Sequence, residues 1–238
     1  MKALVLGPTG VVGDAIVREA LQDPRITSIA AVTRRPLKHR DPRLSVVEHR
    51  DFSDFKPLDR LLAPTDVILC ALGLSWYQAR GEAHYRQVTH DHVMACARAA
   101  SVANPAMRFC FVSGHGAGAN SSQAWARIKA ETERDLEATF GSRLHVFRPG
   151  YIYPKAGRDT RYWGDVVMMP FMPFRAAMSR WITDSDEVAR AVLHAANGGA
   201  VPSPATNLDI LAAAAAYERQ RAALIARAAS QTSARTSR

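Results

Sequence analysis

The stretch from Lys2 to Gly13 constrains the fold most, because it combines a strand, a glycine turn and the start of a helix. Its apolar residues 3–6 have strand length and stop at Gly7, and glycine then returns at Gly10 and Gly13. Apolar residues recur at helical spacing from Val11 onward. A strand that turns tightly into a helix aims that helix's free N–H groups and positive dipole end at one point, which is a phosphate-binding geometry.

The three glycines have the spacing of a dinucleotide-binding turn. Gly7 would permit the turn, Gly10 would let the backbone approach a pyrophosphate, and Gly13 would let the helix pack closely on the strand. We therefore predict that this segment holds the phosphates of a dinucleotide. The residues expected to contact it here are Gly7, Thr9, Gly10, Val11, Val12 and Gly13.

Strands and helices alternate along most of the chain. Further strands are predicted at 28–33, 44–48, 66–72, 107–112 and 144–147, and helices at 58–62, 82–102, 123–140, 184–196 and 208–228. This alternation predicts an α/β fold, a Rossmann-type doubly wound parallel sheet with a small C-terminal helical lobe. We expect one domain over residues 1–228, with the substrate lobe in about 151–228, and a disordered tail at 229–238.

Composition narrows the partners and the compartment. The 31 basic and 22 acidic residues give a net charge of +9, but the arginines are scattered and no nucleic-acid recognition motif is present. The longest apolar run in the C-terminal half is too short to span a bilayer. Cys70, Cys96 and Cys110 lack metal-binding spacing and suit a reducing compartment. We expect a cytoplasmic protein without nucleic-acid, membrane or metal partners, and leave a homodimer open.

The residues after the predicted strands indicate the choice of cofactor. In Rossmann proteins an acid after the second strand receives the ribose hydroxyls of NAD, whereas arginine there accommodates the 2′-phosphate of NADP. This chain has no acid at that point; it has Arg34 and Arg35. We therefore predict NADP as the cofactor, with Asp51 placed to meet the adenine edge. The other contacts expected on the adenosine side are Phe52, Ala71, Leu72 and Gly73.

The order of these motifs resembles the atypical, extended branch of the short-chain dehydrogenase/reductase superfamily. The motifs are GPTGVVG, HRDF, CALG, Ser113, the helix of Lys129 and FRPGYIYP, and they cover roughly residues 1–195. The chain is most similar to epimerase/dehydratase-like proteins and to the Tat-interacting oxidoreductase-like group. The resemblance implies that Ser113 orients a substrate oxygen, that Lys129 holds the nicotinamide ribose, and that Pro149 and Gly150 back the nicotinamide.

The catalytic tyrosine of that superfamily is missing here. It stands four residues before the lysine, and this chain has Trp125 at that position. An indole N–H can donate a hydrogen bond but cannot act as a general acid or base near neutral pH. Three readings stay open: another group supplies the proton, the reaction needs no such tyrosine, or the bound nucleotide serves regulation without turnover. The candidate proton donors are His115, Tyr85, Tyr151 and Tyr153.

We predict an NADP-dependent oxidoreductase, or an allied enzyme, with a non-standard catalytic tetrad. Its candidate catalytic residues are Ser113, Lys129, Trp125 and His115. Residues 151–180 are rich in Met, Phe, Trp and Pro, a composition that suits a small, apolar substrate. The alternative is a non-catalytic NADP(H)-binding protein with a regulatory or scaffold role.

Overall fold

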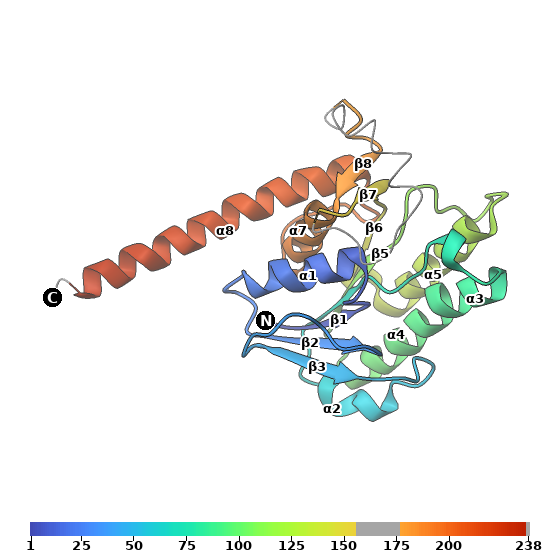
Figure 1. Cartoon of the computed structure of the whole chain (residues 1–238), viewed down its shortest axis with the longest axis horizontal. Helices are drawn as coiled ribbons and strands as arrows, with labels where there is room; N and C mark the ends of the chain where they lie inside the picture. Colours follow the sequence, from blue (N-terminus) through green and yellow to red (C-terminus); the bar gives the residue numbers. More distant parts are fainter. Residues whose placement is uncertain (156–176, 237–238) are drawn as a thin grey trace.

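The computed structural model describes residues 1–155 and 177–236, and its centre is a six-stranded parallel sheet (Figure 1). The strand order is β3-β2-β1-β4-β5-β6. Strands β1 to β3 are therefore added toward one edge of the sheet and β4 to β6 toward the other, and the order reverses between β1 and β4. This order confirms the predicted Rossmann-type sheet. The strands are β1 (Lys2–Leu6), β2 (Ser28–Thr33), β3 (Leu44–Glu48), β4 (Val67–Cys70), β5 (Arg108–Val112) and β6 (Leu144–Phe147).

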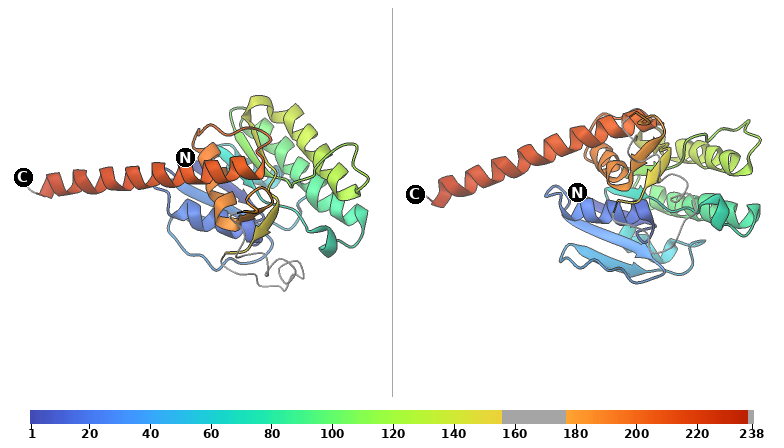
Figure 2. Two further views of the ribbon diagram at one scale, coloured as in Figure 1. Left: turned by 90° about the horizontal axis from the view of Figure 1, so that it is seen from above. Right: turned by 45° about the horizontal axis from the view of Figure 1, so that its top comes forward.

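Helices cover both faces of this sheet, as Figures 1 and 2 show. One face carries α1 (Val11–Leu21), α7 (Ser185–Ala196) and the first turns of α8 (Asn207–Thr236). The other carries α2 (Asp59–Leu62), α4 (His92–Ala103) and α5 (Ala124–Phe140). Successive residues of β1 enter opposite cores: Val5 packs on the first face and Leu6 on the second. This is why the strand is apolar throughout rather than alternating.

The register of the sheet brings several loops to one edge. Leu6 of β1 pairs with Val32 of β2 and with Cys70 of β4, so these three strands end together. Cys70 in turn pairs with Phe111 near the end of β5. The segments after these strands therefore share the carboxyl edge, where ligands of open α/β sheets bind.

The predicted helix over 82–102 is interrupted. It consists of α3 (Glu82–Arg86), a π-helical turn η3 (Gln87–Asp91) and α4. A π turn frees carbonyl groups from the usual helical pattern. Here the Thr89 carbonyl accepts a hydrogen bond from the Thr132 hydroxyl of α5, at 3.3 Å. Three short 3₁₀ turns lie elsewhere: η1 (Lys56–Leu58), η2 (Trp76–Gln78) and η4 (Gly141–Arg143).

The C-terminal lobe differs in two ways from the sequence expectation. A second, two-stranded parallel sheet pairs β7 (Tyr151–Tyr153) with β8 (Ile182–Asp184), and this pair was not predicted. Helix α8 continues to Thr236, whereas we predicted a helix to Ala228 and a disordered tail from 229. The tail contains neither proline nor glycine, so its sequence has no helix-stopping residue. Residues 156–176, most of the predicted substrate segment, lie outside the described residues.

The base of α8 is fixed to the sheet domain by buried charges, while its far end projects from the body (Figure 2). Glu19 of α1 is 2% exposed and accepts hydrogen bonds from Arg190 of α7, at 3.0 Å, and Arg221 of α8, at 2.7 Å. Tyr217 donates to the buried carboxylate of Asp23 at 2.9 Å. Within the described part of the chain, no helix has both the length and the apolar character that crossing a membrane requires.

Candidate functional site

The glycine turn after β1 is closed so tightly that only glycine fits at two of its positions. Gly7 has a φ of +76°, and its carbonyl accepts a hydrogen bond from the Gly10 N–H at 3.1 Å. A Cβ on Gly7 would lie 2.7 Å from the Ala71 oxygen, and one on Gly13 would lie 2.0 Å from the Gly7 oxygen. The turn therefore presses the start of α1 against β1 and against the end of β4.

The N-terminus of α1 is left open by the same turn. Gly10 is the N-cap residue, and no side chain caps the first N–H groups of the helix. A Cβ on Gly10 would meet only the Gly7 oxygen, at 3.4 Å. Uncapped N–H groups and the positive end of the helix dipole suit a phosphate. The backbone around Gly7, Gly10 and Gly13 is therefore suited to a phosphate, and Thr9, Val11 and Val12 lie between these glycines.

Two exposed arginines follow β2 next to this turn. The Arg35 guanidinium donates to the Thr9 hydroxyl at 3.2 Å, which connects the loop after β2 to the glycine turn. The guanidinium carbon of Arg34 lies 5.9 Å from the centre of the Phe52 ring. Both side chains therefore lie at the carboxyl edge of the sheet, and neither has a carboxylate partner in the described residues.

Asp51 and Phe52 follow β3 at the same edge, but Asp51 is exposed and Phe52 is buried. The Asp51 carboxylate is exposed and accepts from the Ser53 hydroxyl and from the Ser53 N–H, at 2.9 Å, bonds that lower the pKa of Asp51. Phe52 is 5% exposed and packs on His92, with 5.9 Å between ring centres. Sequence analysis did not single out His92.

The residues that follow β4 also lie at this edge of the sheet. The Ala71 N–H donates to the Leu6 carbonyl at 3.0 Å, which extends the pairing of β1 and β4 by one residue. Leu72 packs partly into the core, and a Cβ on Gly73 would meet no atom within 4 Å. The predicted adenosine-side residues Ala71, Leu72 and Gly73 therefore lie beside Gly7, with open space at Gly73.

Helix α5 brings Trp125, Lys129 and Glu133 to one face, because they are spaced four residues apart. The Lys129 stem lies against the loop after β5: a Cβ on Gly114 would be 3.5 Å from the Lys129 Cδ and Cε. Its Nζ lies 5.7 Å from the centre of the Phe111 ring. Burial lowers the pKa of Lys129 to about 8, although the Glu133 carboxylate acts in the opposite direction.

Ser113 is buried at the end of β5, and its hydroxyl donates to Glu133. The same carboxylate accepts from the Arg148 Nε at 3.0 and 3.1 Å, so Ser113, Glu133 and Arg148 form one linked group. The hydroxyl hydrogen of Ser113 is thereby used within the protein. Glu133 was not predicted, and the available signal was its spacing of four residues from Lys129 on the same helix.

Trp125 and His115 lie over the loop after Ser113. The Trp125 indole N–H donates to the Gln123 side chain, and a Cβ on Gly116 would be 3.4 Å from the indole ring. His115 is exposed, and its ring meets Trp181 edge to face with 4.9 Å between centres. Trp181, which precedes β8, was also missed by sequence reasoning.

Pro149 and Gly150 join this loop to the C-terminal lobe. The Pro149 carbonyl accepts from the His115 N–H at 2.8 Å, and a Cβ on Gly150 would be 2.2 Å from the Trp181 oxygen. The glycine is thus required by the close approach of the Trp181 backbone. Pro149 and Gly150 lie next to His115, where the family resemblance places the nicotinamide end.

The candidate tyrosines differ in accessibility. Tyr85 is 1% exposed and packs edge-on against Trp76, with 5.2 Å between centres. Burial raises the pKa of Tyr85 to about 12, and the side chain is almost closed to a substrate. Tyr151 is half-buried in β7, and Tyr153 is 37% exposed.

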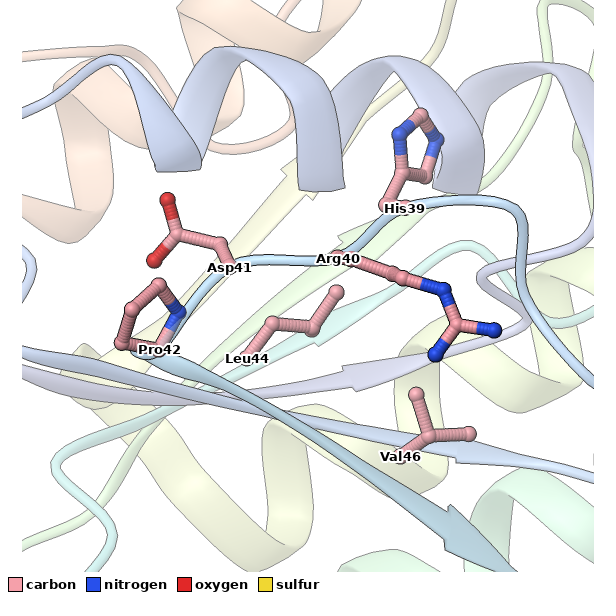
Figure 3. Close-up of a pocket in the computed structure, with 6 residues that line it drawn as sticks. All are labelled: His39, Arg40, Asp41, Pro42, Leu44 and Val46. Atoms are coloured by element: carbon pink, nitrogen blue, oxygen red, sulfur yellow. The ribbon is translucent and has the colours of Figure 1, made fainter.

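Two surface hollows of the described residues lie away from this edge. One, of about 450 Å³, lies between β3 and the loop before it and is lined by His39, Arg40, Asp41, Pro42, Leu44 and Val46 (Figure 3). Arg40 extends over Val46 there. A second lies between the segment after β3 and α4, and its lining includes Phe55 and Val102. Neither contains a predicted site residue.

One group of side chains in the described part of the chain has the composition of a cation site: His90, Glu131 and Asp135. Arg86, however, donates to both Glu131 oxygens, at 2.7 and 2.6 Å. His90 contacts Asp91 at 2.7 Å and Asp135 at 3.0 Å. These contacts explain the group as an ion-pair network between η3 and α5. The absence of a metal from this protein stays a prediction.

An uncapped helix over a glycine turn, at the reversal point of a parallel sheet, defines a dinucleotide-binding Rossmann protein. Residues 7–162 match the family described as NAD(P)H-binding, and the chain belongs to this family. The chain is 32% identical to "Protein FMP52, mitochondrial" of Eremothecium gossypii over 165 residues, 69% of this chain and 71% of the relative. It is 30% identical to "Protein HTATIP2" of Rattus norvegicus over 152 residues, 63% of this chain and 61% of the relative.

Solved structures support the same class. The UDP-glucose 4-epimerase of Thermotoga maritima superimposes with a TM-score of 0.63 at 16% identity, covering 82% of this chain and 73% of the enzyme. MoeE5, solved with UDP-glucose and NAD, gives a TM-score of 0.63 at 19% identity, covering 86% and 75%. These structures share the fold, and together with the family match and the similarity to HTATIP2 they support the suspected atypical short-chain dehydrogenase.

The expected cytoplasmic location is contradicted by these relatives. Those from Eremothecium gossypii, Debaryomyces hansenii and Aspergillus fumigatus are all named mitochondrial proteins. The sequence argument was wrong because it inferred the compartment from the reduced cysteines. These cysteines are buried in the core of the fold and do not identify a particular compartment.

Proposed function

We propose that this protein is an NADP(H)-dependent oxidoreductase that acts on a small, apolar molecule. The observation that carries the proposal is that the glycine turn and the Ser113–Lys129 pair lie at one edge of the sheet, as a dinucleotide with a reactive end requires. NADP(H), when bound, supplies or accepts the hydride. Arg34 and Arg35 favour a cofactor with a 2′-phosphate, because a guanidinium matches phosphate geometry and no acid replaces it there.

Lys129 is the residue in this arrangement best suited to move a proton. Its pKa of about 8 lets Nζ exchange a proton near neutral pH, which the Trp125 indole cannot do. Its ammonium has no hydrogen-bond partner among the described residues, so it is free to meet a substrate or ribose oxygen. Ser113 can accept a hydrogen bond from a substrate hydroxyl while its own hydrogen stays with Glu133.

A second candidate function is a non-catalytic NADP(H)-binding regulator. It is favoured by the fact that the side-chain hydrogens of Ser113 and Trp125 are already donated within the protein. Ser113 donates to Glu133, and Trp125 donates to Gln123. A protein with this arrangement can bind the nucleotide and change shape or partners without turnover.

Calorimetry with NADPH and NADH tests the cofactor, and a reduction screen tests turnover. We expect NADPH to bind more tightly than NADH. In the screen, the unaltered protein and Trp125→Tyr are given NADPH and a panel of small apolar ketones and aldehydes. Oxidation of NADPH by the unaltered protein supports the oxidoreductase. Activity only in Trp125→Tyr supports the regulator, and failure to bind either nucleotide overturns both proposals.

A further inference from the structure

The Phe52 ring brings together a guanidinium and an imidazole from distant parts of the chain, and the nearby His49 ring also packs on it, with 5.6 Å between ring centres. The Arg34 guanidinium carbon lies 5.9 Å from the ring centre, and the His92 ring centre lies 5.9 Å away. Arg34 follows β2, Phe52 follows β3, and His92 is the first residue of α4. Phe52 is 5% exposed and also packs on Phe55, so it is a fixed support for both groups.

Several elements contribute charges around His92. Burial is the largest influence and lowers the pKa of His92, and the charges of Arg34 and of His84 on α3 lower it further. Asp91 of η3 and Asp51 after β3 act in the opposite direction. The net effect is that the pKa of His92 lies below its ordinary value, so the imidazole is neutral near pH 7.

We propose that His92 is a second recognition group for the 2′-phosphate of NADP(H), acting beside Arg34, and that it takes up a proton when the phosphate binds. This inference rests on the proposed NADP(H) site. The positive charge of Arg34 disfavours protonation of His92. A phosphate bound to Arg34 brings negative charge to this place, which favours the protonated imidazole. An imidazolium then gives the phosphate a second charge-assisted donor.

Proton uptake fixes the direction of the pH dependence. His92 has a higher pKa in the NADPH complex than in the free protein, so NADPH affinity is greatest at low pH and decreases as pH rises between those two values, by at most about tenfold per pH unit. The second pKa of the 2′-phosphate is about 6, and its dianion binds better than its monoanion. Ionisation of the phosphate therefore makes NADPH affinity increase with pH, opposite to the effect of His92. A variant lacking only the imidazole separates the two contributions.

The experiment is calorimetry of NADPH and NADH binding to the full-length protein between about pH 6 and pH 8, in buffers with different heats of ionisation. The variants are His92→Asn and the control His145→Asn, a histidine on β6 that is not among the groups acting on the pKa of His92. We expect net proton uptake with NADPH but not with NADH. In His92→Asn the uptake disappears and NADPH binds about three- to tenfold more weakly at the acid end, while His145→Asn behaves as the unaltered protein.

Titration of the His92 C2–H signal by nuclear magnetic resonance, with and without NADPH, gives the same answer without a variant. An unchanged His92 pKa on NADPH binding would overturn the inference, as would equal losses of NADPH and NADH affinity in His92→Asn. These results leave the proposed cofactor intact if Arg34→Ala still weakens NADPH selectively. Absence of NADPH binding by the folded, unaltered protein overturns the inference together with the proposed function.

Discussion

The glycine turn and the Lys129 face of α5 lie at the same edge of the sheet, but their polar groups are arranged differently. At the turn, the first N–H groups of α1 have no side-chain cap and are open to an anion. In the second region, the hydrogens of Ser113 after β5 and Trp125 on α5 are already donated to Glu133 and Gln123. The first region can bind an anion as it stands, whereas Ser113 and Trp125 must break an internal hydrogen bond before they can donate to a substrate. Binding and turnover can therefore be separated by experiment.

The largest effect is expected from Gly13→Ala in the turn. The new Cβ would lie 2.0 Å from the Gly7 backbone oxygen, which no side-chain rotation can relieve. We expect a loss of about 3 kcal/mol in the free energy of unfolding, with loss of nucleotide binding. Gly73→Ala is the matched control, because a Cβ there meets no atom within 4 Å. Denaturant unfolding of both variants decides the matter, and equal stabilities would contradict the close packing.

Glu133→Ala tests the second region, with a loss of about 2 kcal/mol in stability expected. It leaves Arg148 without its carboxylate at a partly buried position and frees the Ser113 hydroxyl. It also lowers the pKa of Lys129 further, because Glu133 is the main group that raises it. Glu131→Ala, on another face of α5 and paired with Arg86, is the control. A Lys129 titration unchanged by Glu133→Ala would show that the two groups do not interact.

Arg34→Ala tests the adenosine end of the first region. Removing a charge-assisted contact to a 2′-phosphate weakens NADPH binding by about tenfold and leaves NADH unchanged. Stability changes little, because the Arg34 side chain is exposed. Calorimetry with both nucleotides measures the change, with exposed Arg40→Ala as control. If both nucleotides bound the variant as they bind the unaltered protein, the NADP assignment would be wrong.

The difference between the two regions also explains which features could be predicted from the sequence. The six strands and the glycine turn follow from local patterns: apolar runs, glycine spacing and residues at strand ends. Glu133, His92 and Trp181 were missed because their importance arises from contacts across the fold. Ser113 and Glu133 are 20 residues apart, and Phe52 after β3 meets His92 at the start of α4. The β7–β8 pair has strands too short to give a periodic signal.

Lys129→Met is expected to give the smallest effect, a change in the free energy of unfolding. It removes the charge of Lys129 and keeps a side chain of similar length. The folded pKa of Lys129 is about 8 and the ordinary value is 10.5, so between these values the unfolded chain binds more protons than the folded protein. Stability from this group therefore rises with pH across that window, and the cost of burying the charge is fully present below about 8. Methionine removes the cost, so we expect Lys129→Met to be about 1 kcal/mol more stable at pH 7, a value reduced by the partial exposure of the side chain.

The control for this change is the exposed Lys56→Met. The unaltered protein and this control should gain stability between about pH 8 and pH 10 relative to Lys129→Met, which should lack that gain. Parallel pH profiles for all three proteins would mean that Lys129 keeps its ordinary pKa. The proton would then have to come from His115 or from water, and the α5 face would retain only a binding role.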